Sequence, residues 1–290
     1  MIKKNKTISL PRWLTLTSAV LAVLMSYICL PIKPHILAIR AGVANAYHLG
    51  STLNTIYDEA LCTHTNQSVH NVDNMYPEAR ILQQNHDIIF QEYETLRQKH
   101  NGQISTFQQL DSSQQLLESW QVLWLKLYGL NTCLPGEFPR TVELVRASGL
   151  PVQSIMISRL AAGDTLPRHT GPTNGVLRLL MAIHTSSTPE YPYLEVWDTK
   201  NVGQSYTEKP HRLEFQLGEL VVFDDSYVHA SHNPTSDERI VLWLDLERRD
   251  FKGWREWLWN KLIFQIIRFI QPPPIPQVVT RTNQHFCSTK

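Results

Sequence analysis

The spacing of hydrophobic residues divides the chain into an apolar run, a helical region and a region of short strands. Residues 13–32 contain no charged side chain. At a rise of about 1.5 Å per residue, a helix of this length is roughly as long as the hydrocarbon core of a bilayer is thick. The pattern therefore predicts a transmembrane helix over 13–32, between an N-terminal segment 1–12 and a linker 33–50.

The charges around this run predict its orientation. Basic residues are more frequent before it than directly after it, with Lys3, Lys4, Lys6 and Arg12 on one side and Lys33 and Arg40 on the other. The positive-inside rule then places residues 1–12 in the cytosol and the catalytic domain of a single-pass membrane protein on the non-cytosolic side. A cleaved signal peptide, suggested by Ala-Asn-Ala at residues 44–46, and a buried helix are the alternatives.

Residues 51–135 have a helical pattern. Glycines are few, and apolar residues recur at intervals of three and four. Pro77 fits the first turn of a helix that carries Ile81 and Ile89. A second helix is expected over 116–127, with an apolar stripe interpreted as core packing: Leu116, Leu117, Trp120, Leu123, Trp124 and Leu127.

Residues 136–250 have the pattern of a β domain. Short β-rich runs recur at fairly even spacing, at 154–160, 175–184, 193–197, 211–215, 219–225 and 239–246. Such spacing favours an antiparallel sandwich or barrel, and the lack of repeated βα units argues against a parallel sheet. Residues 251–290 are predicted to be an amphipathic helix over 253–270 and a tail. Its tryptophans and basic residues suit either a membrane interface or packing on the core.

Composition narrows the function. Hydrophobic residues make up 42% and charged residues 18% of the 290 residues, as in a packed globular protein. The net charge is +1 and no basic cluster occurs, so nucleic acid is not an expected partner. The four cysteines, Cys29, Cys62, Cys133 and Cys287, lack zinc-site spacing. A disulfide between Cys62 and Cys133 is open if the domain lies outside the cytosol.

Two histidines are the candidate metal ligands. His169 lies in RHTGPTNG, a turn between two strand candidates, and His229 lies in FDDSYVHASHN, directly after a strand. Non-heme Fe(II) oxygenases use two imidazoles and a carboxylate on one face of the metal. The usual carboxylate, two residues after the first histidine, is replaced by Gly171, which directs attention to Asp224 or Asp225. Hydrogen-bonded structural histidines are the alternative.

Arg178 and Arg239 each fall in an otherwise apolar strand. A buried guanidinium needs an anionic partner, and arginine matches a carboxylate through two parallel hydrogen bonds. The two carboxylates of 2-oxoglutarate are one possible source of that partner. A structural ion pair with Asp224, Asp245 or Glu195 is the other.

The order of these motifs resembles the catalytic domain of the aspartyl/asparaginyl β-hydroxylases. The resemblance covers about residues 120–250 and rests on HTGPTN, LRL, GELVVFDDSYVH and RIVLWLDL, with a preceding WQVLWLKLYG. It implies a mainly β fold, a double-stranded β-helix of the jelly-roll or cupin type. It also implies Fe(II) as cofactor, with 2-oxoglutarate and O₂ as cosubstrates.

The resemblance assigns a role to each site residue. His169 and His229 would be the iron ligands, in a family that tolerates glycine at Gly171. Asp225 would orient an iron-bound water. The remaining three would bind carboxylates: Ser158 and Arg239 the distal carboxylate of 2-oxoglutarate, and Arg178 a carboxylate of cosubstrate or substrate.

Three hypotheses on function follow. The leading substrate is an Asp or Asn side chain of a peptide or protein, although Val176 and Leu180 stand where aspartyl hydroxylases commonly carry a basic residue and a histidine. The second substrate is a lipid acyl chain, since residues 247–262 resemble the tail of lipid A hydroxylases. The third hypothesis is a catalytically silent, membrane-bound binding module of the same fold.

Overall fold

The structure is a computed structural model that describes residues 67–102, 119–171, 173–186, 190–203, 208–251 and 253–270, with residues 279, 282, 283 and 286. The predicted transmembrane helix 13–32 and linker 33–50 lie outside these ranges. Within the described ranges, no helix has both the length and the apolar character that crossing a bilayer requires.

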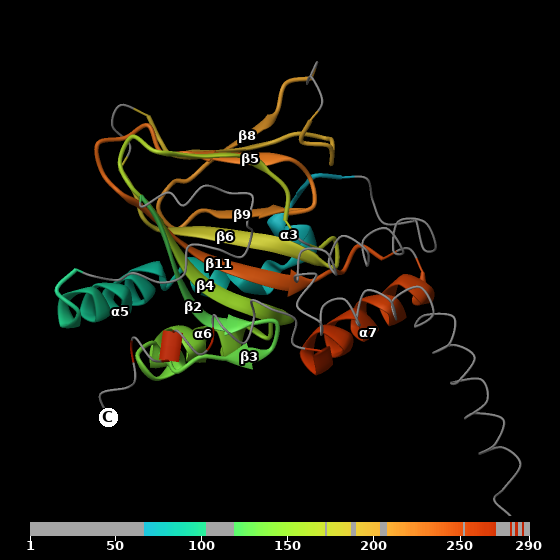
Figure 1. The fold of residues 1–290 in the computed structure, drawn as a ribbon, viewed down its shortest axis with the longest axis horizontal. Coiled ribbons are helices and arrows are strands. Elements are labelled where there is room, and N and C mark those ends of the chain that lie inside the picture. Colours follow the sequence, from blue (N-terminus) through green and yellow to red (C-terminus); the bar gives the residue numbers. More distant parts are fainter. Residues whose placement is uncertain are drawn as a thin grey trace, which may run out of the picture.

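Two antiparallel β-sheets form the body of the molecule (Figure 1). The larger sheet has the order β1 (Val69–His70), β9 (Leu220–Phe223), β6 (Val176–His184), β11 (Arg239–Glu247), β4 (Val152–Leu160), β2 (Trp120–Leu127) and β3 (Leu130–Asn131). The smaller sheet has the order β5 (Thr165–His169), β10 (His229–His232), β7 (Tyr193–Val196) and β8 (His211–Glu214). The prediction of a mainly β domain with antiparallel sheets is therefore confirmed.

All six predicted strand runs are strands, namely β4, β6, β7, β8, β9 and β11. The pattern did not predict β5 and β10, which carry the two histidines. β5 reads TLPRH and β10 reads HASH, so neither has the apolar alternation of a half-buried strand. Pro167 is tolerated in β5 because that strand lies at the edge of its sheet.

The helix predicted over 116–127 is wrong. Residues Trp120–Leu127 form strand β2, which pairs with β4 in the larger sheet, so this sheet begins before residue 136. Val122 to Leu125 are buried along both faces of the strand. A strand buried on both sides reads as a continuous apolar run, which periodicity cannot distinguish from a buried helix. Leu116 and Leu117 lie outside the described residues.

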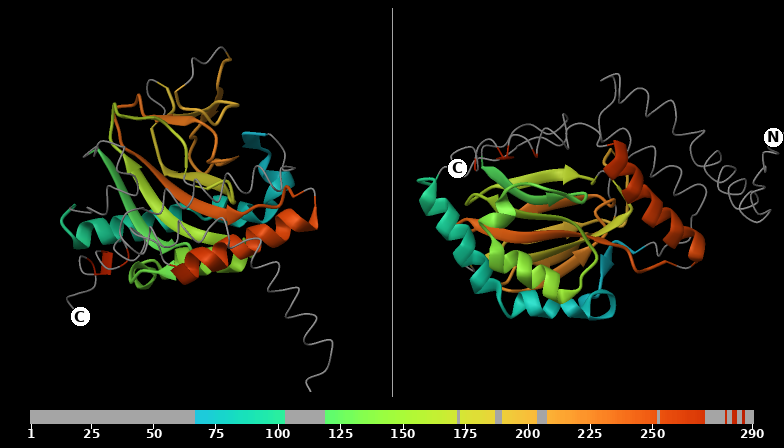
Figure 2. Two further views of the ribbon diagram at one scale, coloured as in Figure 1. Left: turned by 45° about the vertical axis from the view of Figure 1, so that its right-hand side comes forward. Right: turned by 90° about the horizontal axis from the view of Figure 1, so that it is seen from below.

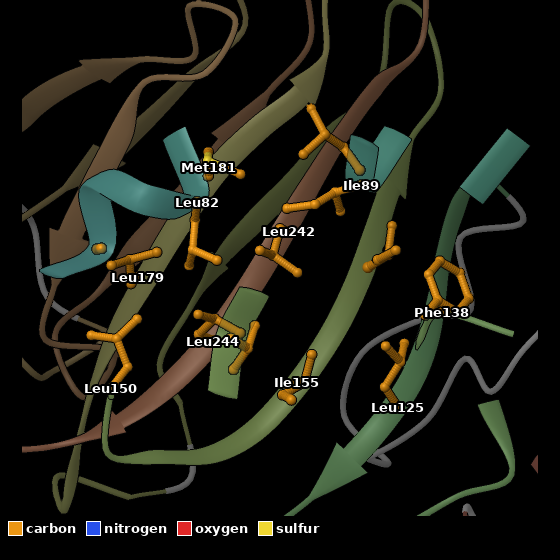
Figure 3. Packing of buried hydrophobic residues seen from close by; sticks show 14 of the residues in the cluster. Leu82, Ile89, Leu125, Phe138, Leu150, Ile155, Leu179, Met181, Leu242 and Leu244 are labelled. Carbon is orange, nitrogen blue, oxygen red and sulfur yellow. The ribbon is translucent and has the colours of Figure 1, made fainter. Parts of the chain in front are cut away.

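Helices cover the outer face of the larger sheet (Figure 2). After α3 (Val72–Met75), Pro77 begins the short 3₁₀-helix Pro77–Ala79, as its predicted place in a first turn requires. The chain continues through α4 (Arg80–Gln83) and α5 (His86–Lys99), and α6 (Pro139–Ser148) follows the short 3₁₀-helix Leu134–Gly136. Leu82 and Ile89 pack with Leu179 and Leu242 of the sheet in one core (Figure 3).

The alternation of side chains along β6 and β11 separates this core from the interior between the sheets. Leu179 and Leu242 face the helices, whereas Leu180 and Val241 belong to the cluster between the two sheets. Successive residues of a strand point to opposite faces. Both Arg178, in register with Leu180, and Arg239, in register with Val241, therefore face the interior, where both line one cavity.

The predicted C-terminal helix is present as α7 (Trp254–Ile270). Asn260 and Phe264 are buried, whereas Trp254 and Trp257 are 69% and 52% exposed. Cys133 is disulfide-bonded, and the other three cysteines lie outside the described residues. The pairing of Cys133 with Cys62 stays a prediction.

Candidate metal and cosubstrate site

The fold brings the two histidines together although sixty positions separate them in the sequence. His169 ends β5, His229 begins β10, and the two residues are paired in the antiparallel register of these strands. Their ring centroids are 4.1 Å apart and their planes are inclined by 56°. Both rings line the cavity between the sheets.

Backbone carbonyls determine which ring nitrogens can bind a metal. His169 Nδ1 lies 2.7 Å from the Pro167 carbonyl, and His229 Nδ1 lies 2.8 Å from the Tyr227 carbonyl. Each Nδ1–H therefore donates to a carbonyl, and each Nε2 carries the lone pair. Burial, reinforced by the neighbouring His169, lowers the pKa of His229 well below its usual value, so this ring is neutral.

Asp225 lies beside this pair. Its Oδ1 is 3.3 Å from His229 Nε2 and forms an ion pair with Arg178, while its buried Oδ2 has no hydrogen-bond partner. Burial raises the pKa of Asp225 to about 7 against the opposing effect of Arg178. An imidazole lone pair and a carboxylate oxygen this close together are stabilised by a cation near them.

Gly171 makes room for this carboxylate. A Cβ at position 171 would lie 1.4 Å from Asp225 Oδ2. The Gly171 N–H also donates to the Asp225 carbonyl at 2.7 Å. The Asp225 carboxylate thus fills the space into which a side chain two residues after His169 would project.

Asp224, the other candidate carboxylate, faces elsewhere. It pairs with Arg248 at 2.6 Å and accepts hydrogen bonds from the backbone and hydroxyl of Ser226. Despite its burial, the Arg248 charge holds the pKa of Asp224 below its usual value. Asp224 is therefore a structural ion-pair partner, and Asp225 is the aspartate at the histidines.

The donor set fits a first-row transition metal. Two neutral imidazoles of fixed tautomer and a carboxylate oxygen without a partner are hard-to-intermediate ligands of the kind such ions prefer. Among the residues that the structure describes, no group of three His, Cys, Asp or Glu side chains is arranged to hold a metal. The site therefore offers two imidazole ligands, with Asp225 beside them.

A cavity of about 380 Å³ extends from the histidines between the sheets. Its lining is largely apolar, with a few polar groups, as in sites for small molecules. The lining residues are Trp120, Ser158, Leu166, His169, Arg178, Leu180, Leu194, Phe223, His229, Ser231, Arg239, Val241 and Trp243.

Arg239 is a buried cation in this cavity. Its Nη1 donates to Ser231 Oγ at 2.7 Å, its Nε has no hydrogen-bond partner, and no carboxylate of the described residues forms an ion pair with it. Burial lowers the pKa of Arg239 to about 10. Ser158 lines the same cavity and accepts a hydrogen bond from Trp120 Nε1 at 3.0 Å. This part of the cavity has the charge that a carboxylate ligand would neutralise.

Arg178 has its anions within the protein. Its guanidinium contacts Asp225 and lies 3.0 Å from Asp245 Oδ1, and its Cζ lies 3.6 Å from the centre of the Trp243 ring. Trp243 Nε1 donates to the same Asp245 oxygen at 2.9 Å. Of the structural pairs considered from the sequence, the one with Asp245 is present. The assignment of Arg178 to a ligand carboxylate stays a prediction.

Four lining or supporting residues were not singled out as site residues in the sequence: Trp120, Ser231, Trp243 and Asp245. A signal was available for two of them. Counting in steps of two from Arg239 along β11 places Trp243 and Asp245 on the same face of the sheet. Trp120 was assigned to a helix, and Ser231 lies in a strand that the pattern did not predict.

Comparison with known proteins gives three kinds of match. Residues 83–249 match the family model described as aspartyl/asparaginyl β-hydroxylase. An ornithine lipid ester-linked acyl 2-hydroxylase of Rhizobium tropici is 25% identical over 179 residues, which cover 59% of this chain and 57% of that protein.

Two solved structures illustrate the third kind. A prolyl-4-hydroxylase of Pseudomonas putida is 17% identical, with 68% of this chain and 99% of that chain covered and a TM-score of 0.37. A 2OG-Fe(II) oxygenase family oxidoreductase of Burkholderia pseudomallei is 11% identical, with 46% and 67% covered and a TM-score of 0.32.

Proposed function

The chain belongs to the aspartyl/asparaginyl β-hydroxylase family, and from this premise we propose that it is an Fe(II)- and 2-oxoglutarate-dependent hydroxylase. We also interpret β4 to β11 as a double-stranded β-helix. The strand orders β9-β6-β11-β4 and β5-β10-β7-β8 support this interpretation, because the chain passes between the sheets as in a jelly roll.

One observation carries the proposal. A single cavity contains two imidazoles that can bind a metal and a buried guanidinium that has no carboxylate partner among the described residues. 2-Oxoglutarate combines a metal-chelating keto acid with a second carboxylate. Its two ends match the two chemical features of the cavity.

The residues divide the work accordingly. His169 and His229 would hold the metal through Nε2, and Arg239 with Ser158 would bind the distal carboxylate. Asp225 would accept a hydrogen bond beside the metal through Oδ2. The apolar lining excludes water from the reacting C–H bond. Bound Fe(II) would activate O₂, and overall a C–H bond, O₂ and 2-oxoglutarate would give an alcohol, succinate and CO₂.

For the substrate we favour a lipid acyl chain over an Asp or Asn side chain. The relative from Rhizobium tropici is named as an acyl hydroxylase of a lipid. Arg178, the residue that could bind an acidic side chain, is held by Asp225 and Asp245. An acyl chain requires no such cation, and Leu166, Leu180 and Leu194 give the cavity an apolar wall.

Turnover of the full chain tests the proposal. With Fe(II), O₂ and 2-oxoglutarate, we expect succinate release that rises when lipid extract is added, and lipids that gain one oxygen by mass spectrometry. Arg239→Ala should lose this activity, whereas Arg159→Ala, which removes a partly exposed partner of Glu238, should keep it. Oxygen gained on Asp or Asn peptides would reverse the substrate assignment. No succinate in any mixture would leave the silent binding module.

A further inference from the structure

The first turn of α7 exposes two large aromatic side chains. Trp254 and Trp257 are 69% and 52% exposed and lie three residues apart on one helix. Soluble monomers rarely leave contiguous apolar surface of this kind in water. Indole rings prefer the boundary between the headgroups and the acyl chains of a bilayer.

α7 is attached to the metal-site end of the sheets. Asn260 Nδ2 donates to the Gly175 carbonyl at 2.6 Å, and Phe264 is buried beside the same glycine. Gly175 closes the loop that begins at His169. Glu247, at the end of β11, pairs with Val176, at the start of β6. The helix therefore begins at the end of the sheets where the two histidines lie.

The first described residues lie at this same end. Val69 of β1 pairs with Phe223, and the Asp224 N–H donates to the Ser68 carbonyl at 2.8 Å. Asp225 and His229 follow directly in the sequence. Figure 1 shows α3, which follows β1, on the same side of the sheets as α7. The preceding part of the sequence contains the uncharged run 13–32.

We propose that the first turn of α7 docks on the surface of a lipid bilayer, so that the metal-site end of the domain faces the membrane. Charge favours this occupant, because residues 252–261 carry three basic side chains (Lys252, Arg255 and Lys261) and one acidic side chain (Glu256), and bilayers that contain anionic lipids attract such segments. The docking itself does not depend on the proposed function. Its consequence, a short path for an acyl chain to the metal, does rest on it.

Fluorescence quenching by brominated lipids measures the docking directly. The full chain is placed in phosphatidylcholine vesicles that contain a minority of phosphatidylglycerol, with bromine near the headgroup end of the acyl chains. Three proteins are compared: wild type, Trp254→Phe/Trp257→Phe, and a control with two buried indoles replaced, Trp124→Phe/Trp197→Phe. Each variant keeps six of the eight tryptophans. Phenylalanine keeps the sites apolar and removes only the reporting indoles.

We expect the loss of emission caused by bromine to fall at least twofold in the Trp254→Phe/Trp257→Phe variant and to stay at or above the wild-type level in the buried pair. Equal quenching in the two variants overturns the docking. Unchanged quenching together with cross-links between copies at α7 also overturns it, since a second copy would then cover the helix. Iron content and 2-oxoglutarate binding in the same samples test the proposed function separately, because neither depends on the two indoles.

Discussion

Arg178 and Arg239 lie on the same inner face of the larger sheet and line the same cavity, yet they differ in their partners. Arg178 contacts two aspartates and the face of Trp243. Arg239 donates to a serine hydroxyl, lies 5.0 Å from the Phe215 ring centre and has an Nε without a partner. The first arginine is neutralised by the protein, and the second can be neutralised by a ligand.

The difference shows that an arginine in an apolar strand does not identify its own function. Both residues gave the same signal in the sequence, a cation among apolar residues. The partners that the tertiary structure supplies separate them. A guanidinium with carboxylate partners orients those carboxylates, here Asp225 beside the histidines, whereas a guanidinium without one is an anion receptor.

The largest expected effect concerns the metal, to which both halves of this comparison refer. His229→Ala should abolish stoichiometric iron binding, because two imidazoles are the protein ligands and neither can be spared. Iron per chain is measured after dialysis against Fe(II) under anaerobic conditions. His211→Ala, which removes an exposed histidine far from the cavity, is the control and should keep its iron. Full iron in the His229→Ala protein would contradict the assignment of the metal ligands.

The next effect is on stability. Arg178→Ala leaves Asp225 and Asp245 buried without their counterion, which typically costs about 3–5 kcal/mol. Urea unfolding of the metal-free protein measures this loss. Arg239→Ala is the matched variant and should cost far less, because it removes a buried cation that has no carboxylate partner among the described residues. Equal losses in the two variants would remove the distinction between the arginines.

The order of the two variants reverses for cosubstrate binding. Arg239→Ala should weaken 2-oxoglutarate binding by about 2–4 kcal/mol, or roughly 30- to 1,000-fold in Kd, through loss of a charge-assisted contact in a dry pocket. Calorimetric titration of the metal-loaded protein checks this. Arg239→Lys keeps the charge without the bidentate geometry and should fall between the two. An Arg239→Ala protein with unchanged Kd and lower stability would make this arginine structural as well.

The smallest effect tests how Asp225 is accommodated. In Gly171→Ala the new methyl group meets the Asp225 carboxylate, and overpacking of this kind typically costs about 1–3 kcal/mol. We expect lower stability and lower turnover, with iron still bound through the histidines. Gly136→Ala, at a position with open space around its Cβ, controls for the change of residue type. Gly171→Asp should be worse than Gly171→Ala, because a second carboxylate has no space beside the first.

The sequence by itself determined the β region and its antiparallel class, because half-buried strands alternate and leave a period that can be read. Period two also fixed that Arg178 and Arg239 sit among apolar neighbours. The sequence misassigned residues 120–127, because a strand buried on both faces carries no period. It also missed β5 and β10, since short polar strands owe their conformation to pairing with distant segments.

Within the site, the sequence identified His169, His229, Asp225, Ser158 and both arginines as candidates, but not their relations. Only the tertiary structure decided that Asp225 and not Asp224 lies at the histidines, that Gly171 leaves the space this carboxylate fills, and that Asp245 neutralises Arg178 while Arg239 has no such partner among the described residues. The physical reason is that charge pairing depends on distance in space. A strand register that brings residues sixty positions apart into contact is set by the whole sheet and not by any local pattern.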